Sequence, residues 1–180
     1  MTTPLATGHP VDLATGPLTG EGSGIRRFLS NVYGEDAETE LTRYRDLEHR
    51  FHSSFGDYPS LFVSAPGRVE IGGNHTDHNN GRIIAASVTL DSVTAAGRSD
   101  DNTILLSSAG YPDLFRVSLE DLRPVKEERG TTAALIRGIA ARCAEAGYAV
   151  GGFRASVESR VKPGSGLSSS ASIEMLIGMI

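Results

Sequence analysis

The chain has 180 residues, of which 39% are hydrophobic and 22% charged, and its formal net charge is −5. These values are typical of a folded globular domain, and the acidic balance argues against a nucleic-acid partner, which a basic face would bind. No stretch is apolar enough to predict a membrane span or a signal peptide, so no membrane partner is expected. The single cysteine, Cys143, cannot form an internal disulfide, and we therefore expect a protein of the reducing cytoplasm.

The first predicted elements are an arm, a helix and a strand. Residues 1–24 hold five glycines, three prolines and five threonines, which predicts a flexible arm because little apolar surface offsets its ordering entropy. The remaining residues, 25–180, are predicted to form one domain. Apolar residues recur every three or four positions over residues 35–55, as in an amphipathic helix. A buried strand is expected over residues 61–65, ended by Pro66 and Gly67.

The rest of the chain predicts more strands and two further helices. Segments that are rich in β-branched residues or that alternate apolar and polar residues are expected to be strands: 82–96, 102–108, 114–119 and 153–161. Over residues 131–146 the apolar residues recur at helical spacing, which predicts a helix there, and a last helix is expected from about Ser170. This order of elements predicts an α+β domain with a mixed β-sheet. Because no stop signal follows the last helix, we expect the chain to be part of a longer protein.

The sequence GSGLSSSAS occupies residues 164–172, between the last predicted strand and the last predicted helix. The first N–H groups of a helix have no internal partner and favour negative charge, while glycines let a ligand approach the backbone closely. The segment therefore predicts a phosphate-binding loop. A flexible linker is the alternative, but a linker would not contain a leucine or run directly into an apolar helix. The lysine of a Walker A loop and the GxSxG of a nucleophile elbow are both absent from it.

With the two preceding residues, KPGSGLSSSAS resembles the nucleotide-binding motif of the GHMP kinases, the superfamily of galactokinase, homoserine kinase, mevalonate kinase and phosphomevalonate kinase. The resemblance implies an amino-terminal α+β domain with a mixed sheet and packed helices, the ribosomal protein S5 domain 2-like fold. It also implies ATP and Mg²⁺ as cofactors, with the Ser170 hydroxyl near the metal. The residues implied to bind ATP are Gly164, Ser165, Gly166, Leu167, Ser168, Ser169 and Ser170. Ser108, at the end of a predicted strand, is a further nucleotide contact by the same resemblance, and a plain strand end is the alternative.

A second polar segment, APGRVEIGGNHTDHNNG, occupies residues 65–81. Its HTDH resembles part of a zinc motif, but the first histidine of that motif would fall at Gly73, which leaves only two ligands. The segment GRVEIGGNHTDHN is more similar to the galactokinase signature. The predicted helix AALIRGIAARC also resembles the galactokinase helix that lies between the two motifs. Both motifs occur in the order found in galactokinases.

The galactokinase resemblance implies roles for five residues and a reaction that yields galactose 1-phosphate. Arg68 is implied to stabilise the transferring phosphoryl group, and the residues implied to bind the sugar are Asn74, His75, Thr76 and Asp77. The family's general base and acidic Mg²⁺ ligand lie beyond the equivalent of these 180 residues, so this length of chain is expected to be inactive alone. Asn74 and His78 replace a glutamate and a tyrosine of the family. Arabinose, a uronic acid and N-acetylgalactosamine therefore stay open as substrates, as does a non-catalytic sugar sensor.

Overall fold

The computed structural model describes residues 11–12, 23–73 and 80–180 of the chain. In chain order its elements are β1 (Val11–Asp12), α1 (Ser23–Tyr33), η1 (Gly34–Asp36), α2 (Ala37–Phe55), β2 (Leu61–Gly72), β3 (Ile84–Arg98), β4 (Thr103–Ser108), β5 (Phe115–Ser118), η2 (Lys126–Glu128), α3 (Thr132–Glu145), β6 (Phe153–Ser159) and α4 (Ser169–Met179). The predicted α+β class is confirmed. The flexible arm predicted over residues 1–24 lies mostly outside the described residues, and its described parts are ordered, since β1 pairs with β2 and α1 begins at Ser23.

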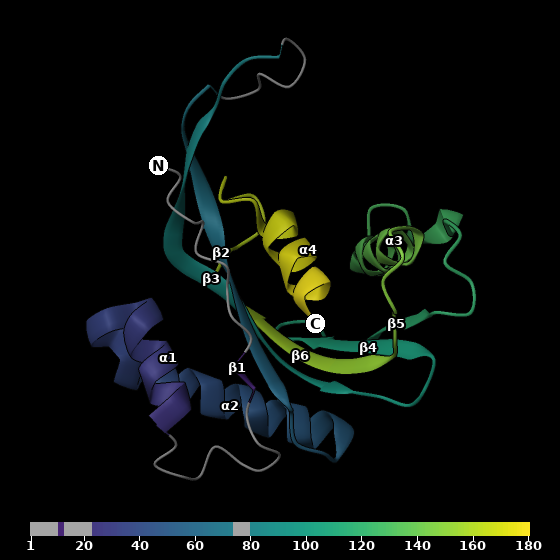
Figure 1. The fold of residues 1–180 in the computed structure, drawn as a ribbon, viewed down its shortest axis with the longest axis horizontal. Coiled ribbons are helices and arrows are strands. Elements are labelled where there is room, and N and C mark those ends of the chain that lie inside the picture. Colours follow the sequence, from purple (N-terminus) through teal and green to yellow (C-terminus); the bar gives the residue numbers. More distant parts are fainter. Residues whose placement is uncertain (1–10, 13–22, 74–79) are drawn as a thin grey trace.

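The strands form one mixed sheet in the order β1-β2-β3-β6-β4-β5 (Figure 1). All neighbours are antiparallel except β4 and β6, which are parallel, with Ser108 paired with Val157. Parallel neighbours end at the same edge of a sheet. The segments that follow β4 and β6, although far apart in the sequence, therefore start side by side.

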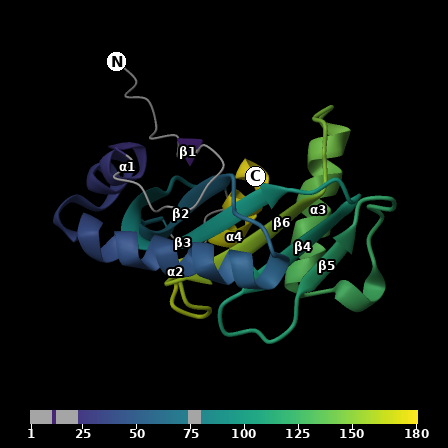
Figure 2. The same cartoon turned by 90° about the horizontal axis from the view of Figure 1, so that it is seen from below.

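Helices cover both faces of the sheet. Helices α1 and α2 lie on one face, and α3 and α4 lie on the other, with α4 between α3 and the β2–β3 pair (Figures 1 and 2). Two apolar clusters fill the resulting layers because side chains alternate between the faces of a strand. On β3, for example, Val93 packs toward α2, whereas Ala96 packs toward α3 and α4. In the described ranges, no helix has the length and apolar character needed to cross a membrane.

Two local predictions were incomplete or wrong. The sequence analysis did not predict α1, although Ile25 and Leu29, one helical turn apart, are both buried against α2 and the sheet. Strand β2 does not end at Pro66 and Gly67 but continues to Gly72. The pairing of β2 with β3 shifts register between Pro66 and Arg68, as in a β-bulge. A bulge accommodates both a proline, which has no N–H to donate, and an unpaired glycine.

A buried ionic cluster joins α2 to the sheet. The Arg43 guanidinium donates from Nη1 to Asp91 Oδ1 (2.7 Å) and from Nε to Glu158 Oε1 (3.1 Å). It also donates to Glu40 of its own helix at 3.2 Å. The Arg43 side chain is only 4% exposed. A buried charge is tolerated when it is paired and hydrogen-bonded. The carboxylates of Asp91 and Glu158 therefore hold the Arg43 side chain, and with it α2, against β3 and β6.

The opposite face of β3 is tied to α4 by hydroxyl groups. The Ser172 Oγ, which is buried, lies 2.7 Å from Ser92 Oγ and 2.9 Å from the carbonyl oxygen of Ala65. Ser92 Oγ in turn lies 2.6 Å from Ser159 Oγ. The start of α4 is therefore held against β2, β3 and β6 by side-chain hydrogen bonds as well as by apolar packing.

Candidate active site

The two motifs meet where β2 passes the serine loop, residues 162–168. The backbone N–H of Arg68 donates to the carbonyl oxygen of Leu167 at 3.1 Å. A side chain at Gly67 would be tight, because a Cβ there would lie 3.1 Å from the same oxygen and 3.2 Å from Val88 Cγ2, and these neighbours would have to shift by a few tenths of an ångström. The glycine of the GRV sequence thus permits the close approach of the loop, and Arg68 is held beside it.

The serine loop has a backbone that favours glycine. Gly164 and Gly166 have φ values of +75° and +74°, and no atom lies within 4 Å of a Cβ built on either residue. The Ser165 hydroxyl donates to the carbonyl of Lys162 at 2.6 Å and lies 3.4 Å from the Leu167 nitrogen. Ser165 therefore closes the loop through its own hydroxyl, while the two glycines leave the loop's outer side open.

The loop leads into α4 without a side-chain cap. Ser168, the N-cap residue, has a left-handed backbone (φ 61°, ψ 56°), and its side chain makes no capping hydrogen bond. Its carbonyl accepts the first helical bond, from the Ser172 nitrogen. The N–H groups at Ser169 and Ser170 precede that bond and are unpaired within the helix. A non-glycine residue in this conformation is uncommon and is often found at functional sites.

A pocket of about 470 Å³ lies between the start of α4, the end of β4 and the start of α3. Its lining includes Ser169 and Ser170 from the start of α4, Ser108 from the end of β4, and Thr131 and Thr132 at the start of α3. The structure thus brings Ser108 together with two of the predicted loop residues. The parallel pairing of β4 with β6 accounts for this, since it places the ends of both strands at one edge. The lining does not include Gly164, Ser165, Gly166, Leu167 or Ser168.

The pocket is lined by both apolar and polar residues. Leu106 and Phe115, from β4 and β5, contribute apolar side chains, as does Leu135 of α3. Two helix amino termini and several hydroxyls contribute the polar part. A pocket with an apolar portion and hydrogen-bond donors at helix starts fits a ligand that has both a planar or apolar group and an anion.

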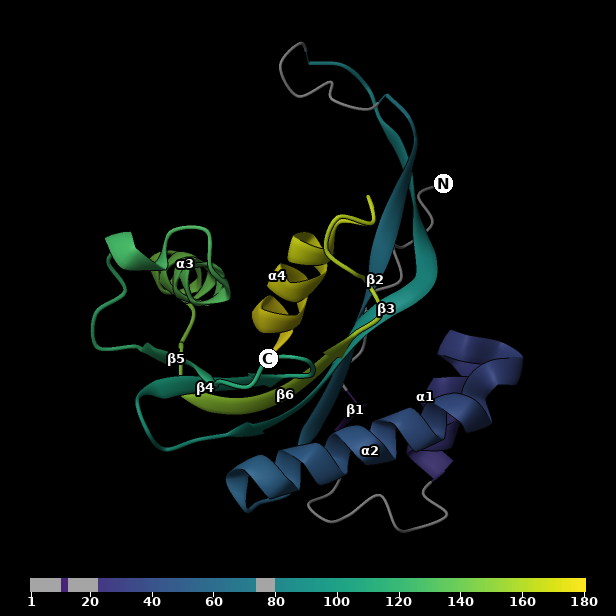
Figure 3. The same cartoon turned by 180° about the vertical axis from the view of Figure 1, so that it is seen from behind.

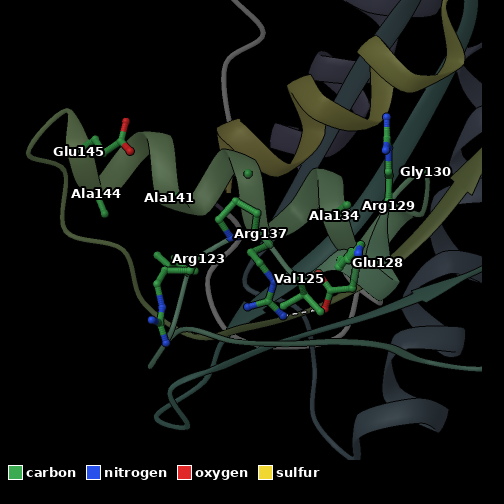
Figure 4. A pocket seen from close by; sticks show the side chains of 14 residues that line it. Arg123, Val125, Glu128, Arg129, Gly130, Ala134, Arg137, Ala141, Ala144 and Glu145 are labelled. Carbon is green, nitrogen blue, oxygen red and sulfur yellow. Dashed lines mark hydrogen bonds and ion pairs between the residues drawn. The ribbon is translucent and has the colours of Figure 1, made fainter.

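A groove of about 760 Å³ lies on the outer side of α3 and contains none of the predicted site residues (Figure 4). Arg137 donates from Nε and Nη2 to the two carboxylate oxygens of Glu128 at 2.8 and 2.7 Å. These bonds lower the pKa of Glu128 and raise that of Arg137. Arg137 also donates to the Asp121 carbonyl at 2.6 Å. Its charge is therefore used to hold the segment before α3 against that helix.

The predicted sugar-binding residues, Asn74, His75, Thr76 and Asp77, lie outside the described residues, so their roles stay predictions. The strand pair that leads to them extends beyond the helices as a two-stranded ribbon (Figure 3). Arg68 lies at the base of this ribbon with its side chain half exposed, and its Nη2 is 3.4 Å from Glu70 Oε1. The guanidinium is therefore accessible to solvent, but Arg68 does not line the 470 Å³ pocket.

The described residues alone do not form a complete metal site. Over residues 23–73 and 80–180, no three His, Cys, Asp or Glu side chains are grouped closely enough to hold a metal ion. Ser170 is exposed and lines the pocket, so its hydroxyl is accessible as a single oxygen ligand. Mg²⁺ in phosphate-transfer sites is held largely by water and phosphate oxygens, with only one or two protein ligands. The hydroxyl fits one such ligand.

Similarity to solved structures identifies the class of fold. The structure matches a mevalonate kinase of Methanococcus jannaschii with a TM-score of 0.53 over 64% of this chain and 37% of that one, at 18% sequence identity. At that identity the match shows the fold alone. It agrees with the motif resemblance, and the chain has the fold of the GHMP kinase superfamily.

In sequence the chain is similar to galactokinases. A family described as "Galactokinase galactose-binding signature" matches residues 49–98. The galactokinase of Ligilactobacillus salivarius is 35% identical over 74% of this chain and 35% of its own length, and that of Streptococcus thermophilus is 34% identical over the same shares. The solved galactokinase of Lactococcus lactis, complexed with galactose, matches with a TM-score of 0.68 and 29% identity over 76% of this chain and 36% of that one. The chain thus spans about a third of the length of these relatives.

Proposed function

We propose that the protein is an ATP- and Mg²⁺-dependent sugar kinase that phosphorylates the anomeric hydroxyl of galactose. The observation that carries this proposal is the contact between the two motifs, in which Gly67 and Arg68 lie against Leu167 of the serine loop. A kinase must hold its acceptor and its phosphate donor close together and in line. The galactokinase relatives support galactose as the acceptor.

In this proposal the serine loop and the start of α4 bind the nucleotide phosphates. The positive φ values and open outer sides of Gly164 and Gly166 fit a cradle that any Cβ would narrow. The N–H groups at Ser169 and Ser170 are oriented for an anion by the helix. ATP supplies the phosphoryl group, and the Ser170 hydroxyl contributes one oxygen toward Mg²⁺.

Arg68 and the residues that follow β2 serve the acceptor side. The Arg68 guanidinium stabilises negative charge as it develops on the transferring group, which is where phosphoryl transfer needs stabilisation. Asn74, His75, Thr76 and Asp77 bind the sugar, with the Asp77 carboxylate accepting hydrogen bonds from sugar hydroxyls. Residues 25–180 act as the amino-terminal domain, preceded by the arm of residues 1–24. The general base is expected from further along the full-length protein.

The test is an assay of ADP release by the full-length protein against a panel of sugars. Galactose is expected to be the fastest substrate. Much faster turnover of arabinose, a uronic acid or N-acetylgalactosamine would reassign the sugar and leave the kinase class in place. Galactose binding without any turnover would instead identify a sugar sensor, which the intact serine loop disfavours.

A further inference from the structure

The chain contains only two lysines, Lys126 and Lys162. They lie in different cavities, since Lys126 lines the groove beside α3 and Lys162 lines the 470 Å³ pocket. Among the described residues that line this pocket, Lys162 is the one with a charged side chain. It stands at the amino-terminal end of the serine loop, and Ser169 and Ser170, which follow that loop, line the same pocket.

The backbone of Lys162 is fixed, but its charge is unused. The Ser165 nitrogen and hydroxyl both donate to the Lys162 carbonyl, at 3.2 and 2.6 Å. The Lys162 side chain is exposed, and it has no hydrogen-bond or ion-pair partner among the residues that the structure describes. The turn of the loop therefore fixes the backbone of Lys162 beside the pocket, and no described residue neutralises its ammonium group.

The rest of the pocket lining supplies little positive charge to balance a polyphosphate. A helix amino terminus is equivalent to about half an elementary charge, and the serine and threonine hydroxyls of the lining are neutral. A nucleotide polyphosphate carries several negative charges. No carboxylate lines the described pocket to compete for the ammonium. Lysine is suited to this task because it is a compact charge on a flexible stem.

We propose that Lys162 binds phosphate oxygens of the nucleotide and supplies the cation that the GSGLSSSAS sequence itself lacks. A Walker A loop has its lysine at the carboxyl-terminal end, just before the helix. Here the lysine precedes the first glycine and approaches the phosphates from the opposite end of the loop. This inference rests on the proposed function, because the ligand is the nucleotide of the proposed kinase.

A titration of the protein with ADP and with adenosine tests the inference through binding alone. Lys162→Met is expected to weaken ADP binding about tenfold, the loss that corresponds to one charge-assisted hydrogen bond. The same variant should leave adenosine binding unchanged and flatten the salt dependence of ADP binding. Lys162→Arg should retain most of the affinity. Lys126→Met, in the other groove, is the matched control and should match the parent.

Acetylation of the two lysines gives a second readout, without any substitution. ADP is expected to slow the acetylation of Lys162 several-fold, as followed by mass spectrometry of its peptide, and to leave Lys126 unaffected. If the parent binds ADP but neither Lys162→Met nor the acetylation rate of Lys162 responds, the inference is wrong and the proposed kinase stands. If the parent binds no nucleotide at all, both proposals fail together.

Discussion

The Arg68 backbone N–H and the Leu167 carbonyl oxygen are 3.1 Å apart and join the sugar-side motif to the serine loop. Arg68 belongs to β2 just after its bulge, and Leu167 stands one residue before the N-cap of α4. A shift of the loop relative to β2 would break this bond. A backbone hydrogen bond therefore helps to set the relative position of the two motifs.

Gly67→Ala is expected to weaken ADP binding about tenfold. An added Cβ would lie 3.1 Å from the Leu167 oxygen, and overpacking of this kind costs about 1–3 kcal/mol. The serine loop would have to move away from β2. Isothermal titration with ADP measures the effect. Gly138→Ala is the control, because its Cβ meets open space in α3 and should stabilise the fold by about 0.5–1 kcal/mol. Parental affinity in Gly67→Ala would show that the loop position does not matter for binding.

Arg68→Ala is expected to lower kcat of the full-length protein by about 10²-fold or more, with a smaller change in KM. A guanidinium that serves the transferring phosphoryl group acts mainly in the transition state. Steady-state kinetics with varied ATP and galactose separates the two constants. Glu70→Gln removes the neighbouring carboxylate 3.4 Å away and should change kcat little. A rise in KM at constant kcat would make Arg68 a ground-state binder.

Ser170→Ala and Ser172→Ala should affect different properties, nucleotide binding and stability, although the residues are only two positions apart. Ser170 is exposed at the pocket, so its loss should weaken the Mg²⁺ dependence of nucleotide binding with little change in stability. Ser172 is buried and bonds to Ala65 and Ser92, so its loss should cost about 1–3 kcal/mol of stability. Nucleotide titrations with and without Mg²⁺, and urea denaturation, provide the two measurements. Equal effects of the two substitutions would contradict the assignment.

The stability of the protein should decline as the pH rises from about 10 to about 12, in part through Tyr33. Burial, together with the adjacent Asp91 carboxylate that the Tyr33 hydroxyl bonds, raises the pKa of Tyr33 to about 12. Below pH 10 the tyrosine is protonated in both the folded and the unfolded chain. Between the two pKa values only the unfolded chain loses the proton, so alkali favours unfolding there.

Tyr33→Phe should make this decline shallower, as measured by denaturant unfolding at a series of pH values. Tyr44, whose pKa is also raised by burial, accounts for part of the decline that remains. Tyr148→Phe is the control, since Tyr148 is 72% exposed and should leave the decline unchanged. An identical slope in Tyr33→Phe and the parent would show that Tyr33 does not contribute.

Local patterns in the sequence predicted most elements, and the structure shows why some were missed. Period and capping residues identified α2, α3 and α4 to within a few residues. The break expected at Pro66 was wrong because a bulge, which depends on the partner strand β3, absorbs the proline. Helix α1 was missed although its apolar spacing was present in the sequence.

The candidate site was predictable only in part. The serine loop was recognisable because its glycines and hydroxyls are contiguous. The joining of Ser108 with Ser170 in one pocket depends on the parallel pairing of β4 and β6, which no local pattern contains. The contact of Gly67 with Leu167 is likewise a tertiary property. The sugar-side residues 74–77 stay a prediction from the resemblance.

Asp91 and Ser92, consecutive residues of β3, bond to opposite helical layers. Asp91 accepts from Arg43 of α2, and Ser92 bonds to Ser172 of α4. Two consecutive positions of β3 therefore carry polar contacts from two helices, α2 and α4, that are remote in sequence. Contacts of such long range form late and slow the folding of a domain. They also make it difficult for either helical layer to detach alone, so amide hydrogens of α2 and of the first turns of α4 should exchange in a single cooperative opening.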